Sequence, residues 1–148
     1  MNRLKNAVKF VMVILILGAI LYNVPFNRKI EKTVSAVIYE DGKAVGETAV
    51  YIKGEKSNYV FKNREYFSGT FYVECYEESG REDVSAEIAF YDDYGVLSYM
   101  QNGIFPDMEI ENFIYINEEM TDFAFKFKDG RIGATSEDMY EKMTGERL

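Results

Sequence analysis

The chain contains no histidine and no tryptophan, and only one of its 148 residues is a cysteine. Without histidine, neither a Ser-His-Asp triad nor a Cys-His pair can be assembled in its usual form, and the commonest protein ligand of zinc is missing. One cysteine can form neither an internal disulfide nor a thiolate metal cluster. The sequence therefore predicts no cofactor and no metal site, and an enzyme would have to rely on carboxylates alone.

Basic residues are scarce beyond the first nine positions. Arg3, Lys5 and Lys9 precede every acidic residue, and the rest of the chain has 14 basic against 25 acidic residues, a net charge of −11. Such a domain repels the phosphates of nucleic acids, and no basic patch with interleaved aromatic residues offsets the charge. We therefore expect no nucleic acid partner, and the acidity by itself indicates only good solubility.

Proline is rare too, with two residues, and 11 glycines are too few for a collagen-like or linker-like chain. The composition is instead 47% hydrophobic and 28% charged, which is typical of a folded domain. Aromatic residues make up 16% of the chain, from 12 tyrosines and 11 phenylalanines. They favour strands, because such side chains pack well on a pleated surface.

One apolar run, residues 10–22, stands near the N-terminus, and no charge occurs between Lys9 and Arg28. With its flanks this run approaches the roughly 20 residues that cross a bilayer. We expect residues 1–26 to be an uncleaved membrane anchor. The alternative is a cleaved signal peptide, since a basic start and an apolar core of about 13 residues suit that as well. The bulky segment after the run, which includes Pro25, offers no small-x-small cleavage site and favours the anchor.

The charges on either side of the anchor predict its orientation. Three basic residues and the free amine precede the run, and three basic residues follow it: Arg28, Lys29 and Lys32. This slight bias favours a cytoplasmic N-terminus. We therefore expect a single-pass protein of the cell membrane whose C-terminal domain lies outside the cytoplasm.

Turn signals organise the remainder of the chain. Residues 27–33 suggest a short charged stalk, and in residues 34–148 turns recur about every 10–15 residues, which is the rhythm of an all-β domain. Asp41-Gly42 suits a two-residue hairpin turn. Residues 84–91 alternate between apolar and polar side chains, as a half-buried strand does.

The end of the chain changes character. Ser136, or the threonine before it, can cap a helix that Gly145 would end. The predicted fold is mainly β: an antiparallel sandwich or curved meander of about eight strands with a C-terminal helix. Within residues 66–77, Gly69 indicates a bulge or a close backbone approach. Cys75 alternates with Phe71 and Val73, so we expect it to be a buried structural thiol.

Three short motifs carry a resemblance. They are Phe67-x-Gly69-x-Phe71, the turn Tyr91-Asp92-x-x-Gly95, and the Ala-Thr-Ser plus acidic helix of residues 134–141. Together with the N-terminal run, they resemble small single-anchor, extracytoplasmic β-domain proteins of Gram-positive bacteria. The resemblance implies an anchor and a β domain, and it implies no activity.

Carboxylates are frequent but poorly placed for chemistry. Glycoside hydrolysis needs two carboxyl groups at a set separation, and calcium needs several oxygens in one loop. None of the acidic segments has the spacing of an EF-hand loop. The segments are Glu77-Glu78, Asp92-Asp93, Asp107-x-Glu109-x-Glu111 and Glu118-Glu119. Solvated turns explain such pairs in a chain with 25 acidic residues.

Tyrosines give the better signal for function. If Phe71 and Val73 face the core, the outward positions of the strands could form an exposed patch of Tyr51, Tyr72, Tyr76 and Tyr91. Tyrosine is favoured at binding surfaces. The competing interpretation is a second packed layer. We expect a non-catalytic binding or accessory module with a protein, peptide or glycan partner. Two alternatives are a carboxylate-based hydrolase of extracellular or cell-wall sugar and an acidic inhibitor or immunity-type protein.

Overall fold

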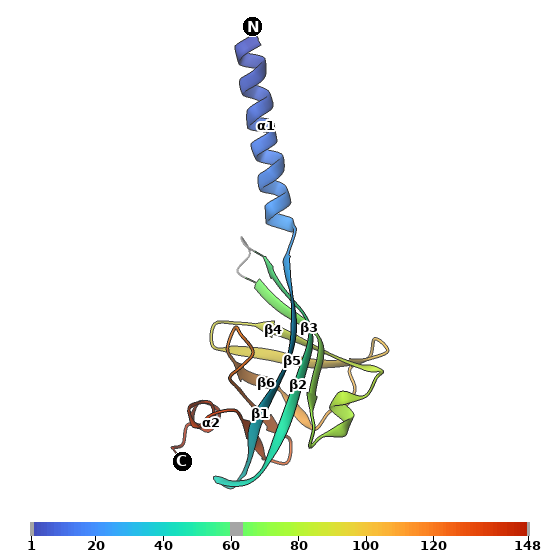
Figure 1. Cartoon of the computed structure of the whole chain (residues 1–148), viewed down its shortest axis with the longest axis vertical. Helices are drawn as coiled ribbons and strands as arrows, with labels where there is room; N and C mark the ends of the chain where they lie inside the picture. The colour runs from blue at the N-terminus through green and yellow to red at the C-terminus, as the bar shows by residue number, and fades with distance from the viewer. Residues whose placement is uncertain (1, 60–63, 148) are drawn as a thin grey trace.

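The computed structural model describes residues 2–59 and 64–147, and a helix at its N-terminus projects from a β domain (Figure 1). This helix is α1 (Asn2–Asn23), and its part Arg3–Asn23 is long and apolar enough to cross a membrane, with a mean hydropathy of 2.1. The described part of the domain consists of β1 (Phe26–Glu40), β2 (Lys43–Tyr59), β3 (Arg64–Val73), the 3-10 helix η1 (Glu77–Gly80), β4 (Val84–Phe90), β5 (Tyr94–Gln101), β6 (Ile110–Ile116), β7 (Phe123–Phe127), β8 (Ile132–Ala134) and α2 (Glu137–Thr144).

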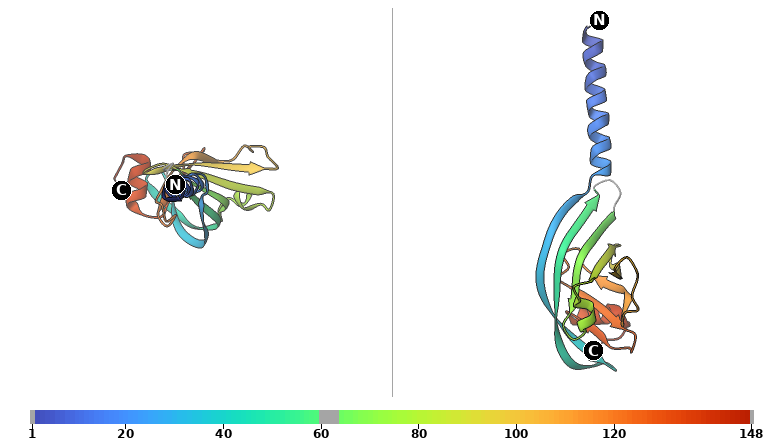
Figure 2. Two further views of the ribbon diagram at one scale, coloured as in Figure 1. Left: turned by 90° about the horizontal axis from the view of Figure 1, so that it is seen from above. Right: turned by 90° about the vertical axis from the view of Figure 1, so that its right-hand side faces the viewer.

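The strands form one closed barrel in which each strand pairs with its neighbour in sequence, all antiparallel. β1 also pairs with β8, which joins the two ends of the sheet. The mainly β prediction, its antiparallel strands and its C-terminal helix are confirmed. The sandwich alternative of this prediction is wrong, because the long strands β1 and β2 curve around the domain and the far half of β1 pairs with β8 (Figure 2). Twist and the irregularity between Ile38 and Tyr39 favour this curvature.

The barrel domain begins earlier than the sequence suggests. Residues 27–33, expected to be a stalk, are the first half of β1 and pair with β2 from Asn27 opposite Ser57 onward. Ile30 faces the interior and is buried, while Glu31 lies outside and forms an ion pair with Lys53 at 3.0 Å. The charges that suggest a stalk are therefore the solvent side of a strand.

Phenylalanine side chains fill the barrel interior. An eight-stranded barrel is just wide enough for side chains to fill it, and here five phenylalanines are almost completely buried: Phe67, Phe71, Phe123, Phe125 and Phe127. Phe71 meets Phe123 edge-on at 5.4 Å between ring centres. The phenylalanines of β7 thus belong to the core, and the alternation predicted for β4 is confirmed by buried Val84, Ala86 and Ile88.

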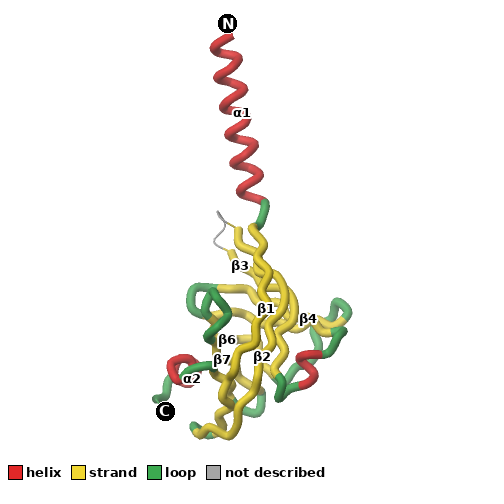
Figure 3. Tube along the Cα trace, in the orientation of Figure 1, coloured by secondary structure: helices red, strands yellow, loops and turns green. Residues whose placement is uncertain are grey.

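α2 covers the outside of the barrel beside β6, β7 and β8 (Figure 3). The Ser136 side chain accepts a hydrogen bond from the backbone N–H of Met139, and Gly145 ends the helix in the left-handed conformation. Both helix signals in the sequence are therefore confirmed. Tyr140 is buried, and its ring centre lies 4.4 Å from that of Tyr39 on β1. This contact fastens α2 over the seam between β1 and β8.

The prediction of a buried Cys75 is wrong, since its side chain is exposed. The alternation that places Phe71 and Val73 in the core stops where β3 ends, at Val73. From there the chain turns into η1, and the Ser79 hydroxyl fixes this turn by accepting from the Val73 N–H at 2.9 Å and donating to the Tyr76 carbonyl at 2.7 Å. A two-residue period holds only while the strand continues.

Gly69 is required by a close approach of two backbones. A Cβ atom added there would lie 2.2 Å from the carbonyl oxygen of Lys53 and 2.6 Å from Cα of Gly54, the residue opposite it on β2. We predict that Gly69→Ala lowers the free energy of unfolding by about 3 kcal/mol or more, because backbone atoms cannot move aside. Denaturant unfolding of the full chain in detergent micelles measures the change.

Gly46→Ala is the matched control, since Gly46 also lies in β2 and a Cβ there meets nothing within 4 Å. Its effect should stay within about 0.5 kcal/mol. Equal stability of the two variants would contradict the close approach.

Candidate functional site

The structure does not gather the four predicted tyrosines into one patch. Tyr51 and Tyr72 lie opposite each other on β2 and β3 and stack, with ring centres 5.5 Å apart and planes 19° apart. Gly80 in η1 lies against the Tyr72 ring, which is half-buried as a result. These two tyrosines form a small pair on the outer wall of the barrel.

Tyr76 is a structural residue that closes the barrel beside η1. Its ring meets Phe127 edge-on at 6.3 Å, its hydroxyl donates to Glu78 Oε2 at 3.0 Å, and the same oxygen accepts from the Glu109 N–H at 3.1 Å. Burial raises the pKa of the Tyr76 phenol above its usual value, although the Glu109 N–H acts in the opposite direction. Like Cys75, Tyr76 comes after the end of β3, where the alternation no longer applies.

Tyr91 belongs to a different set of rings, which we call the aromatic row: Tyr91, Tyr94, Phe113 and Tyr115. Successive ring centres are 4.9, 5.3 and 5.1 Å apart. The first three side chains remain 53%, 37% and 40% exposed. Tyr115 is half-buried and packs against the cluster under α2. The row therefore runs over the outer wall from the β4–β5 turn to α2.

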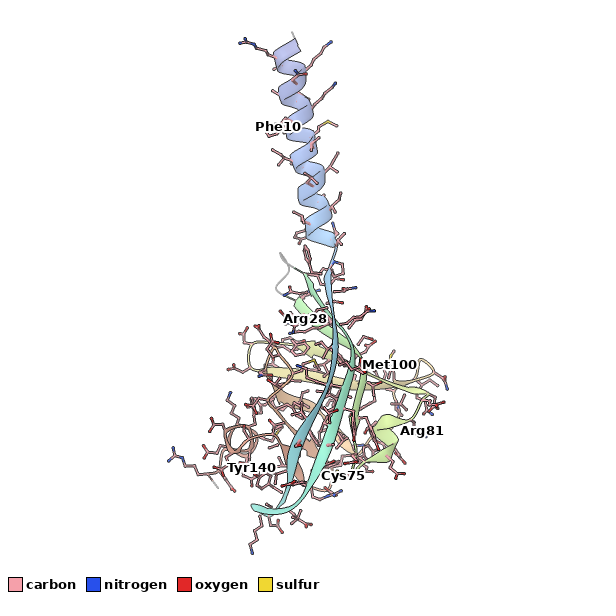
Figure 4. The ribbon with its side chains drawn as sticks, viewed as in Figure 1. Phe10, Arg28, Cys75, Arg81, Met100 and Tyr140 are labelled. Atoms are coloured by element: carbon pink, nitrogen blue, oxygen red, sulfur yellow. The ribbon has the colours of Figure 1, made fainter. Side chains whose placement is uncertain are left out.

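A buried ion pair lies at the end of the barrel nearest α1, where Figure 4 labels Arg28. Lys56 continues the inward-facing row of Val50 and Ile52 and is 6% exposed. Its Nζ lies 2.5 Å from Glu65 Oε2 and donates to the Glu118 carbonyl at 2.6 Å. We call this end of the barrel, with Lys56, Glu65, Phe90 and Glu118, the mouth.

Two further contacts complete the mouth. The Lys56 ammonium lies 4.4 Å from the centre of the Phe90 ring, a favourable cation–π position. Glu65 Oε1 accepts from the side-chain amide of Asn58 at 2.8 Å. One cation of the chain is thus held by a carboxylate, a carbonyl and an aromatic ring, which is how a buried charge becomes tolerable.

Three hollows surround the mouth, and Glu65 lines all of them. One of 280 Å³ opens beside Arg28 toward the α1 end. Another of 520 Å³ lies along the outer wall, where Tyr66, Tyr91 and Tyr94 contribute to it. The third, of 70 Å³, lies between these two and is lined by Glu65, Phe90, Tyr91, Asp92 and Glu118. The mouth and the aromatic row therefore form one continuous region.

Three of the nine carboxylates in the acidic segments of the sequence form ion pairs. Asp107 binds Lys128, and Glu111 lies 3.8 Å from Lys126. Glu119 lies 3.3 Å from Arg28. Within residues 2–59 and 64–147, no group of three or more histidine, cysteine, aspartate or glutamate side chains is placed to hold a metal ion. These carboxylates thus hold the protein's own basic side chains.

The predictions from sequence missed the aromatic row and the mouth, although the alternation of residues along the strands indicates both. Tyr94 and Phe113 occupy outward positions of β5 and β6, so the same alternation that selects Tyr51 and Tyr72 selects them too. Lys56 shares the alternation of Val50 and Ile52, and a charged residue in a buried row predicts a buried partner.

We predict that Lys56→Met lowers the free energy of unfolding by about 2–3 kcal/mol, because it leaves the Glu65 carboxylate without its cation. Changing both residues, as Lys56→Met with Glu65→Leu, should restore most of this loss, since no uncompensated charge remains. Denaturant unfolding at neutral pH compares the two. Lys53→Met is the control, because the exposed pair of Lys53 with Glu31 contributes little. A double variant less stable than the single one would contradict the ion-pair interpretation.

Comparison with known proteins assigns no relative to the chain. No family model matches it, and no curated protein and no solved structure is similar to it at a significant level. We therefore infer the function from the contacts, hollows and exposed rings of the chain itself.

Proposed function

We propose that the chain is a membrane-tethered, non-catalytic binding or accessory module whose binding face is the aromatic row with the hollow beside it. One observation carries the proposal: three stacked rings, Tyr91, Tyr94 and Phe113, are exposed together on the outer wall of an acidic domain. Exposed apolar surface rimmed by polar residues marks interaction sites. Tyrosine offers a large contact area at a low cost in side-chain entropy.

The barrel interior supports binding at the surface rather than inside. It is filled by phenylalanine side chains, as the burial of Phe67, Phe71 and Phe125 shows. A partner must therefore bind on the wall or at the mouth. A carboxylate-based hydrolase has less support, because Glu65 is engaged by both Lys56 and Asn58.

The tether is α1, whose apolar side chains are exposed on all sides of the helix. None of its candidate span, Arg3–Asn23, is buried against the rest of the described structure. A helix of 21 residues is about 32 Å long, which matches the hydrocarbon core of a bilayer. In water the exposure of this surface would be strongly unfavourable, so a membrane is the environment that suits it.

We place the N-terminus in the cytoplasm and the barrel outside. Arg3, Lys5, Lys9 and the N-terminal amine precede the apolar run of residues 10–22, and Arg28, Lys29 and Lys32 follow it. The slight excess of positive charge on the N-terminal side favours that side inside.

The exposed Cys75 offers a direct test of this topology, because it lies toward the end of the barrel away from α1 (Figure 4). We predict that a membrane-impermeant maleimide labels Cys75 in intact cells. Cys75→Ser should not be labelled. In that background, Asn6→Cys should react only after the membrane is permeabilised.

The opposite labelling pattern would overturn the orientation. Recovery of the protein from the medium, with a new N-terminus after the apolar run, would show instead a cleaved signal peptide.

The binding face is tested by crosslinking in native membranes. We predict that changing both Tyr94 and Phe113 to Ala removes at least one crosslinked partner that the unchanged chain recovers, because it removes the centre of the aromatic row. The matched control changes Tyr51 and Tyr72 to Ala, which removes the other stacked pair. Thermal unfolding must show that both variants remain folded. If both variants recover the same partners as the unchanged chain, the aromatic row is not the binding face.

A further inference from the structure

The mouth shows how this chain recognises a positive charge. The Lys56 ammonium is held by the Glu65 carboxylate at 2.5 Å and the Glu118 carbonyl at 2.6 Å, and it lies over the Phe90 ring at 4.4 Å. Carboxylate, carbonyl and ring face together form a site for an ammonium or guanidinium group. The contacts of Lys56 thus show which groups at the mouth can bind a cation.

The same groups line an open hollow directly beside Lys56. Glu65, Phe90 and Glu118 border the hollow of 70 Å³, together with Tyr91 and Asp92. This volume is on the scale of one side-chain head group. Lys56 already neutralises Glu65, so the carboxylates of Asp92 and Glu118 and the Tyr91 ring are the lining groups that remain for a second cation.

The aromatic row ends at this hollow. Tyr94 stacks on one face of Tyr91, with planes 11° apart, and Tyr91 is still 53% exposed. A planar guanidinium placed in the hollow would extend the stack and pair with the Asp92 carboxylate. Arginine suits such a place better than lysine, because it combines stacking with two-point hydrogen bonding to a carboxylate.

We infer that the hollow binds an arginine side chain of a partner protein, presented by a segment that continues along the aromatic row. Arg64 also lines the 520 Å³ hollow, so the part of the segment that lies there would carry neutral side chains. The inference rests on the proposed function and names the partner's chemistry. The net charge of −11 after the first nine residues favours a basic partner and speeds its approach.

A glycan is the less favoured occupant of this region. Sugar rings stack on open aromatic faces, and in the row these faces cover one another: Tyr91 on Tyr94, and Tyr94 on Phe113 with planes 26° apart. Tyr91 stacks with one neighbour only in the row, and it adjoins Asp92 in the chain. This arrangement suits a flat cation better than a chain of neutral sugars.

The test measures the binding of a fluorescent peptide of six Arg-Gly repeats to the full chain in detergent micelles, by fluorescence anisotropy. The matched peptide replaces each arginine with citrulline, which keeps the shape and removes the charge. We expect the citrulline peptide to bind at least about tenfold more weakly. Neutral chitohexaose, added as a competitor, should not displace the arginine peptide.

Two exposed neighbours in the β4–β5 turn give matched variants. Asp92 lines the hollow and Asp93 does not. We expect Asp92→Asn to lower the affinity for the arginine peptide about fivefold, which is the size of effect that a solvent-accessible charge contact has. Asp93→Asn should change its affinity less than twofold. Tyr91→Ala should lower the affinity for the arginine peptide about fivefold or more.

The outcomes separate this inference from the proposed function. Equal binding of both peptides, or equal losses of affinity in the two aspartate variants, overturns the arginine site. Any binding would then come from the general negative charge of the domain. Displacement by chitohexaose would assign the region to a glycan. If the arginine site fails while the change of Tyr94 and Phe113 still removes crosslinked partners, the binding face stands and only its partner's chemistry is wrong.

Discussion

The barrel depends on two glycines that face each other across β2 and β3. Gly54 and Gly69 are paired residues, and the backbones approach so closely there that a Cβ at either position would meet carbonyl oxygen at 2.2 Å. The Phe67 ring occupies the space that a side chain at Gly54 would need. Glycines at such points allow strands to bend, and a neighbouring aromatic ring restores the lost packing. β1, whose Ile30 lies opposite Gly54, follows this bend, and its far half pairs with β8.

The glycine pair also separates two regions of the barrel. On one side the inward rows are apolar, with Ile52 on β2 and Phe71 on β3. On the other side, two positions beyond Gly54, the inward residue is Lys56, and it meets Glu65. A filled core and a charged mouth thus follow each other along the same strands. The core stabilises the fold, whereas the mouth leaves three hollows, because long polar side chains pack less completely than phenylalanine rings.

Local chemistry made much of the fold predictable from the sequence. Asp41 and Gly42 adopt positive φ values in the predicted hairpin, with Glu40 opposite Lys43, and Ser136 caps the predicted helix. The closure of the barrel was not predictable. Only three residue pairs join β1 to β8, and their formation depends on the packing of residues far apart in the sequence. The candidate site shows the same limit: alternation placed Tyr51 beside Tyr72, but it failed at Tyr76, where the strand had ended. Alternation marks Tyr94 and Phe113 as outward, but no local pattern showed that Tyr91, Tyr94 and Phe113 would stack in one row.

The proposed tether would also hold the mouth at a short distance from the membrane. Phe26 follows the end of α1 after two residues, and Arg28 already lines a hollow of the mouth. Five residues of extended chain span about 17 Å at most, so the mouth would lie within that height of the helix end. The buried Lys56 shows that the groups of the mouth stabilise a positive charge even away from water. A mouth held this close to the membrane would meet basic segments of neighbouring membrane proteins, because tethering raises the effective concentration of such partners.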